Sequence, residues 1–450
     1  MLDFLLEIIK TPAIVLGLVA LIGLLLQRKS PGAVFSGALK TALGMLVLSA
    51  GSSLIVTEIQ PFVDLFTKVF DLSGFATSSE AVVGAMQSSV PTIASTSALI
   101  MAIGFLVNIL LARFSPLKYI FLTGHMMWIL SVAIAFSLYV SGFSEPMIIG
   151  VGSALQGVIM VSLPAIAQPL VRRVTGNDYI AIGHLTTLGT ALSGYIGGLV
   201  GDKSKSTEDI KLPESLEFFK DTSVSVSIVI GVFYLVVVIM AGPEAVGEYS
   251  AGANYIVFGI LKAMGFTAGI LILLQGVRMF LGELVPAFKG ISDKLVPGAI
   301  PALDVPALFG YAPNALMVGF VSAVVGMLVA MVASSFAFGT VPLVSIIGAF
   351  FTGGVAGIFG NAAGGRRGAV VSGFIYGFLL IFGAAFLFTL FDFAAYGATG
   401  VGHDCIDVMV MLTILKQPFA GIAIVAAAFV ILCVLQVRRN AKLSAVNDAE

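Results

Sequence analysis

Long apolar runs follow one another along almost the whole chain, separated by short polar or glycine- and proline-rich connections. An α-helix needs about 20 apolar residues to cross the hydrocarbon core of a bilayer. Eleven windows approach this length with at most one charged residue each, and they cover residues 12–27, 33–55, 97–113, 118–140, 147–169, 223–242, 254–276, 313–334, 340–359, 368–391 and 417–437. The pattern predicts an all-α polytopic membrane protein with about eleven transmembrane helices.

Two stretches interrupt this pattern. Residues 56–96 and 277–312 are only moderately apolar and contain many Gly, Pro, Ser and Thr residues. Non-helical backbone at membrane depth persists only where it is buried in protein or lines a water-filled cavity, so we expect two re-entrant hairpins. The alternative for each is an interfacial loop with a surface helix.

The two stretches also divide the chain into similar halves. One membrane domain is expected over residues 1–450. Its first half, 1–222, has five spans, the hairpin 56–96 and a cytoplasmic loop at 170–222; its second half, 223–450, has six spans and the hairpin 277–312. Five spans separate the two hairpins, so the halves have opposite orientation, as in an inverted repeat with a binding site at its interface. The mixed charge of 170–222 fits either a docking surface or a solvated connection.

The composition agrees with a lipid environment. Hydrophobic residues make up 58% of the chain and charged residues 10%, whereas soluble domains carry about 25% charged residues. The formal net charge is -1, and no basic tail or stripe is present, so no nucleic-acid partner is expected.

The Lys and Arg residues indicate an orientation. Basic residues are retained on the cytoplasmic side of a membrane. With the N-terminus outside and the C-terminus in the cytoplasm, eighteen of the 23 basic residues fall inside. This arrangement requires an odd number of spans.

The sequence lacks the motifs of several common functional sites. Cys405 and Cys433 lack C-x-x-C spacing, and no H-x-x-x-H pair or carboxylate cluster indicates a metal site. There is no phosphate-binding loop and no G-x-S-x-G elbow, so no cofactor is expected and any energy must come from elsewhere. The acidic start, residues 1–10, lacks the features of a cleaved signal, so the first apolar run is expected to remain.

Two of the three histidines share a setting. His125 and His184 each follow a glycine, where a ligand can approach the backbone closely. Imidazole donates and accepts hydrogen bonds, which suits a polyhydroxylated solute, although a structural bond to a backbone carbonyl is the alternative. His403, beside Asp404 in an outer connection, is expected to be solvated.

Ionisable residues at membrane depth are functional candidates because burying a charge is costly. Glu80 and Asp304 lie in the middle of the two interrupted stretches, and Asp304 stands between two prolines that prevent a continuous helix. Ion pairing of Asp304 with Arg278 or Lys294 is the competing explanation.

Several motifs together resemble those of the ascorbate-type enzyme IIC permeases of the bacterial phosphotransferase system, and they occur in that family's order. The resemblance covers most of the chain, and the motifs are Leu122-Thr123-Gly124-His125-Met126-Met127, Ile182-Gly183-His184, Gln275-Gly276-Val277-Arg278-Met279-Phe280, Glu283-Leu284, Ala287-Phe288-Lys289-Gly290-Ile291-Ser292, Leu295-Val296-Pro297-Gly298-Ala299 and Ala312-Pro313-Asn314-Ala315.

This resemblance implies a homodimeric inner-membrane permease of eleven helices, two hairpins and an inverted repeat. A core domain would carry the sugar against a dimer-forming domain, and a soluble enzyme IIB, charged by enzyme IIA, would phosphorylate it from a phosphocysteine. Asp304 would be the catalytic carboxylate that orients the reacting hydroxyl or takes its proton. The substrate contacts expected from the resemblance are Ser79, Glu80, His125, Met126, Met127, Trp128, Ile129, His184, Leu185 and Asp304.

Two positions depart from the family pattern. Ascorbate-specific members have glutamines where this chain has Ile129 and Leu185. A site built to hydrogen-bond one solute discriminates against others, so the substrate is L-ascorbate, another sugar acid or a pentitol. The alternatives are a proton-coupled secondary transporter of a sugar acid or pentitol, and a non-transporting receptor or scaffold whose polar residues join helices.

Overall fold

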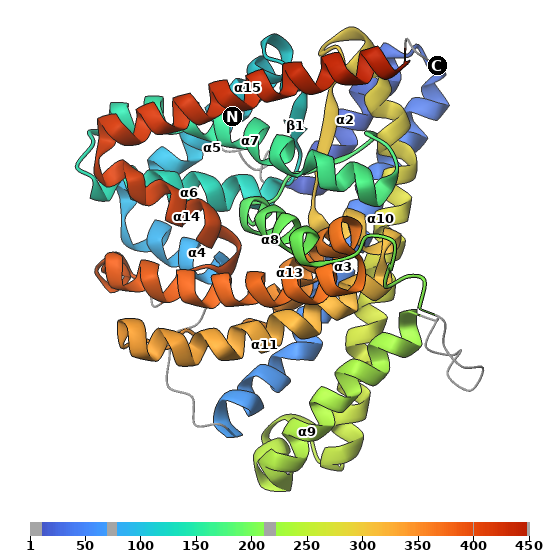
Figure 1. Ribbon diagram of the computed structural model, residues 1–450, viewed down its shortest axis with the longest axis vertical. Helices are drawn as coiled ribbons and strands as arrows, with labels where there is room; N and C mark the ends of the chain where they lie inside the picture. Colours follow the sequence, from blue (N-terminus) through green and yellow to red (C-terminus); the bar gives the residue numbers. More distant parts are fainter. Residues whose placement is uncertain (1–10, 70–78, 211–221, 399, 448–450) are drawn as a thin grey trace.

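The computed structural model of the protein describes residues 11–69, 79–210, 222–398 and 400–447, and helices account for most of them (Figure 1). The α-helices are α2 (Pro12–Leu26), α3 (Pro31–Val69), α4 (Ser79–Ser89), α5 (Pro91–Phe114), α6 (Gly124–Val140), α7 (Glu145–Thr175), α8 (Thr187–Val200), α9 (Thr222–Ser250), α10 (Tyr255–Lys294), α11 (Pro313–Phe338), α12 (Ile346–Gly348), α13 (Gly354–Leu390), α14 (Ile406–Leu412) and α15 (Pro418–Asn447). Shorter 3-10 or π turns are η2 (Val305–Tyr311), η3 (Ala349–Gly353), η4 (Phe393–Tyr396), η5 (His403–Cys405) and η6 (Thr413–Lys416).

The helices confirm an all-α polytopic membrane protein. Among the described residues, eight helices are long and apolar enough to cross a membrane, and the shorter apolar helices include α6 and α8. Each of the eleven apolar windows predicted from the sequence overlaps at least one helix. Helix α15 exposes a run of large apolar side chains that suits contact with lipid: Ile424, Val430, Ile431, Val434, Leu435 and Val437.

Helix α13 is a hairpin of two legs rather than one rod. Its backbone leaves helical geometry at Gly364 and Gly365, and Gly365 has φ 62° and ψ −152°, which only glycine adopts readily. A Cβ placed on Gly360 would overlap the backbone of Gly368. In a straight helix these two residues would be about 12 Å apart. The first leg, with α12 and η3 before it, therefore covers most of the window 340–359, and the second leg covers nearly all of the window 368–391.

Helices α3 and α10 are much longer than a single membrane crossing. They contain 39 and 40 residues, which corresponds to about 60 Å each. They pack along each other so closely that a Cβ on Gly51 or Gly276 would overlap the backbone of the facing helix. Small residues allow this approach in the absence of a hydrophobic driving force between helices.

The lengths of α3 and α10 correct the expected hairpin boundaries. The chain was expected to leave simple helical geometry at residues 56 and 277, yet α3 continues through Pro61 to Val69 and α10 through Pro286 to Lys294. Proline is tolerated inside membrane helices because neighbouring groups satisfy the freed carbonyl. Irregular backbone is present only from residue 295 in the second stretch; part of the first, residues 70–78, lies outside the described residues.

A three-stranded parallel sheet lies among the helices. Its strands are β1 (Tyr119–Phe121), β2 (Ala181–Ile182) and β3 (Ile300–Leu303), in the order β1-β3-β2. The window 118–140 therefore begins with a strand, and α6 starts only at Gly124. The range 170–222 is likewise not one loop, because it contains the end of α7, strand β2 and helix α8.

Candidate functional site

Three polar side chains lie together at the carboxyl-terminal edge of the sheet. Strand β1 ends four residues before His125, β2 ends two residues before His184, and β3 ends directly before Asp304. The carboxyl ends of parallel strands meet at the same edge, where ligands bind in many open α/β sheets. Backbone bonds keep the exits together: Leu122 N–H donates to Ala302 O at 2.9 Å and Gly183 N–H donates to Leu303 O at 2.7 Å.

The carboxylate of Asp304 lies between two imidazoles. His125 Nε2 is 3.6 Å from Asp304 Oδ2, and His184 Nε2 is 3.9 Å from Asp304 Oδ1. Asp304 Oδ1 also accepts the N–H of Val305 at 2.7 Å, which caps η2 and fixes the direction of the carboxylate. The structure thus brings together three residues that the sequence analysis singled out in separate segments.

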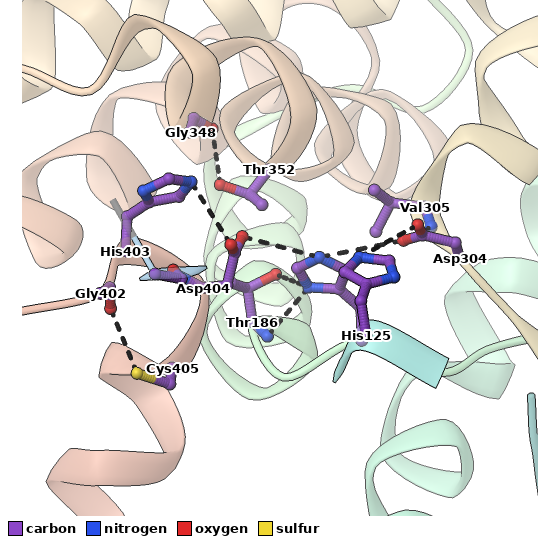
Figure 2. Close-up of polar contacts among 12 residues, drawn as sticks. His125, Thr186, Asp304, Val305, Gly348, Thr352, Gly402, His403, Asp404 and Cys405 are labelled. Carbon is purple, nitrogen blue, oxygen red and sulfur yellow. Dashed lines mark hydrogen bonds and ion pairs between the residues drawn. The ribbon is translucent and has the colours of Figure 1, made fainter. Parts of the chain in front are cut away.

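A second carboxylate continues this row on the far side of His184. His184 Nε2 is 3.8 Å from Asp404 Oδ1, and His403 Nε2 is 3.4 Å from Asp404 Oδ2. All three histidines of the chain therefore stand in one row with two carboxylates (Figure 2). The expectation that His403 is solvated is wrong: the residue is 8% exposed, because η5 folds the connection inward.

Ser79 joins the row through Asp404. Its buried hydroxyl accepts the backbone N–H of Asp404 at 2.9 Å, and a Cβ on Gly402 would come within 2.8 Å of Ser79 Cα. Helix α4 begins at Ser79, so this contact ties the start of α4 to η5. Glu80 is the next residue of α4, and its side chain lies outside the described part of the structure.

The second ring nitrogen of His184, Nδ1, contacts Thr186. The N–H of Thr186 donates to His184 Nδ1 at 3.2 Å, and Thr186 Oγ1 lies 2.7 Å from the same atom. Because Nδ1 accepts a backbone N–H, the proton of the neutral ring belongs on Nε2, where it faces Asp304 and Asp404. The following helix, α8, is anchored by Asp407, whose carboxylate accepts the Gly189 N–H at 2.6 Å.

A pocket of about 20 Å³ opens beside Asp304 and His125. One wall is apolar and comes from α2 and α3, the other comes from the segments after β1 and β3, and the lining residues are Leu16, Met45, Leu48, Leu122, Thr123, Gly124, His125, Leu303 and Asp304. This volume holds roughly one water molecule. A larger solute needs more room than this between α2 and α3 and the strand exits.

The other residues expected at the site lie elsewhere. Met126, Met127, Ile129 and Leu185 are buried in the apolar core, and none of them lines the pocket. Trp128 donates its indole N–H to Gln87 Oε1 at 3.0 Å. Within the described residues, no group of three His, Cys, Asp or Glu side chains is arranged to hold a metal ion.

Two residues that contact His184, Asp404 and Thr186, were not predicted as part of the site from the sequence. The only local signal for Asp404 is its place after His403 in a mostly apolar neighbourhood, since its contacts come from α4 and from the exit of β2. Thr186 had no signal apart from its closeness to His184 along the chain.

Comparison with known proteins gives a consistent match along the chain. Residues 7–407 match the family model EIIC-GAT, described as the PTS system sugar-specific permease component. The chain is also 30% identical over 427 residues to the "Ascorbate-specific PTS system EIIC component" of Mycoplasma pneumoniae (strain ATCC 29342 / M129 / Subtype 1), an alignment that covers 83% of this chain and 64% of that relative. The chain therefore spans less than two thirds of the length of this relative.

Proposed function

The chain belongs to the EIIC-GAT family of sugar-specific permease components of the phosphotransferase system, and we propose that it is an enzyme IIC that brings L-ascorbate into the cell while a separate enzyme IIB phosphorylates it. The family makes it a multi-pass protein of the bacterial plasma membrane. The observation that carries the proposal is the carboxylate of Asp304 between His125 and His184 at the edge of a pocket among the apolar helices.

This arrangement suits a polyhydroxylated solute. A carboxylate accepts hydrogen bonds from hydroxyl groups, and an imidazole can donate one and accept another. His184 would offer only its Nε2–H, because its Nδ1 already accepts the N–H of Thr186. Ascorbate is the substrate we propose because the Mycoplasma relative carries that name. Ile129 and Leu185 replace glutamines of the ascorbate pattern, but both are fully buried and neither lines the pocket. Their identity is thus compatible with an unchanged substrate.

Asp304 is also placed to serve the phosphoryl transfer. The S–P bond of the phosphocysteine on enzyme IIB would break as a P–O bond forms at a solute hydroxyl. The electron pair of the broken bond stays on the cysteine sulfur as a thiolate, and the hydroxyl proton goes to Asp304. The bond from Val305 N–H at 2.7 Å orients the carboxylate for this task.

Movement of the solute would require the two pocket walls to separate. Helices α2 and α3 pack on α10, where a Cβ on Gly23 would overlap the backbone of Ala287. Such close contacts make these helices one rigid unit, so the segments after β1, β2 and β3 would move past it with the solute. We propose that the homodimer contact lies on the α2, α3, α9 and α10 unit, whose helices expose large apolar side chains such as Val232, Val236 and Leu261.

The orientation we propose places the N-terminus outside and the C-terminus in the cytoplasm. Basic connections that would share the cytoplasmic side contact one another: the backbone N–H of Arg366 donates to Lys205 O at 2.8 Å, and Asp178 pairs with both Arg172 and Arg439. In Lys203→Cys, an impermeant thiol reagent added outside intact cells should leave the cysteine at this exposed position unlabelled. Labelling of that cysteine would indicate the opposite orientation.

The test of the function is uptake into proteoliposomes that enclose phosphorylated enzyme IIB. Labelled ascorbate should accumulate inside as its phosphate, and uptake should stop when enzyme IIB is present without its phosphoryl group. Accumulation of unmodified ascorbate driven by a pH gradient would instead support the proton-coupled transporter, for which the row of histidines and carboxylates would supply proton-carrying groups.

A further inference from the structure

A buried hydroxyl beside Asp304 lacks a partner. Thr123 is 5% exposed, and its Oγ1 makes no hydrogen bond with any described residue. Thr123 stands at the N-cap position of α6, where a threonine usually accepts an N–H of the first turn, but its side chain makes no such bond. A buried polar group without a partner destabilises the fold, so a bound ligand is a natural partner for it.

Thr123 lines the same pocket as His125 and Asp304. It is followed there by the first turn of α6, a helix of 17 residues. The first hydrogen bond of this helix runs from Met127 N–H to Thr123 O at 3.0 Å. The N–H groups of residues 124–126 therefore have no intrahelical acceptor, and the positive end of the helix dipole lies at the pocket.

The pocket is consequently asymmetric. Hydroxyl, backbone and imidazole donors come from residues 123–125, whereas the carboxylate of Asp304 faces them from the exit of β3. A solute hydroxyl suits the Asp304 side. A negatively charged oxygen would be repelled by Asp304 but stabilised at the start of α6.

We infer that Thr123 Oγ1 and the first turn of α6 bind an anionic oxygen of the solute, which makes the pocket selective for a sugar acid over a neutral pentitol. The inference rests on the proposed function, because it concerns the solute that the permease carries. It adds Thr123 as a substrate contact and explains why the site would prefer a negatively charged substrate.

The test compares three variants in detergent with labelled ascorbate as the probe and unlabelled ascorbate and xylitol as competitors. Thr123→Val removes the hydroxyl at nearly constant volume, Thr123→Ser keeps it, and Ser334→Ala removes another buried hydroxyl without a partner, on α11, away from the pocket. Thr123→Val should weaken ascorbate binding at least about tenfold, since a hydrogen bond to a charged group is lost.

Thr123→Ser and Ser334→Ala should stay within about twofold of the wild type, the margin of a change that removes no ligand contact. Xylitol should compete no more weakly in Thr123→Val than in the wild type, so the preference for ascorbate shrinks. A purely structural role for Thr123 would weaken both solutes equally.

Ascorbate binding by Thr123→Val at wild-type strength, or an equal loss for both competitors, would overturn the inference while leaving the permease function in place. The proposed function would fall, and the inference with it, if the wild type showed no saturable binding of ascorbate. Should Thr123→Val not fold, a tenfold loss of ascorbate binding in Thr123→Ser, which retains the hydroxyl, would also contradict it.

Discussion

Asp404 contacts two of the three histidines, as Asp304 does. Its carboxylate lies 3.8 Å from His184 Nε2 and 3.4 Å from His403 Nε2, and its backbone N–H donates to Ser79. It does not line the pocket. We therefore expect Asp404 to position His184, which also contacts Asp304.

Replacing Asp404 by asparagine should weaken ascorbate binding about tenfold, because the amide no longer attracts the Nε2–H of His184 as a carboxylate does. Affinity should be measured for Asp404→Asn, His184→Ala and the double variant. If Asp404 acts through His184, the double variant should bind no more weakly than His184→Ala alone. Additive losses would show that Asp404 acts on the solute by another route.

The residues of the site could be predicted from the sequence only in part. His125 and His184 stood out because each follows a glycine, and Asp304 because it stands between two prolines in an apolar chain; the structure brings each histidine within 4 Å of Asp304. Asp404 and His403 did not, because a polar pair in a connection has the same local pattern whether it faces water or folds inward. The contact that folds it inward joins residues 325 positions apart.

At the scale of elements, the small sheet decides where the site forms. Its strands have three, two and four residues, too few to show an alternating pattern, and β1 lies within an apolar run that reads as helix. The long helices were more predictable because each contains a long apolar window, whereas α4, α8 and α14 lie outside the predicted windows. The extensions of α3 and α10 could not be predicted in the same way, because proline usually ends a helix in water but is tolerated in a bilayer.

Gly183→Ala tests the role of the sheet. A Cβ at Gly183 would lie 2.9 Å from Ala302 O, so β2 and β3 would have to separate beside His184. The variant should lose about 1–3 kcal/mol of stability, as overpacked sites do, and bind ascorbate more weakly. Its melting temperature and its ascorbate affinity in detergent measure both effects.

The matched control is Gly150→Ala on α7, where a Cβ would meet open space. Alanine there should preserve binding and leave stability equal or slightly higher, because it restricts the unfolded chain. If both variants had the same stability and the same ascorbate affinity, the close approach of β2 and β3 at Gly183 would not be needed for the site.

At the scale of the whole molecule, the pocket lies where two groups of helices meet. The apolar wall from α2 and α3 belongs to the unit built on α10, and the polar wall belongs to the segments that follow the sheet. The volume between them, about 20 Å³, has room for roughly one water molecule. A transport cycle would open this junction first on one side and then on the other, with Asp304 and the two histidines carried on the moving side.

The most direct test of the central claim is phosphorylation-coupled uptake by Asp304→Asn beside the wild type and Asp392→Asn. Asp392 is the matched control because its exposed carboxylate caps the 3-10 helix η4 as that of Asp304 caps η2. With phosphorylated enzyme IIB enclosed in proteoliposomes, the wild type and Asp392→Asn should accumulate ascorbate phosphate at similar rates, and Asp304→Asn should accumulate none while keeping a wild-type elution profile. Wild-type uptake by Asp304→Asn would contradict the account, because the solute would then cross without the carboxylate around which the site is built.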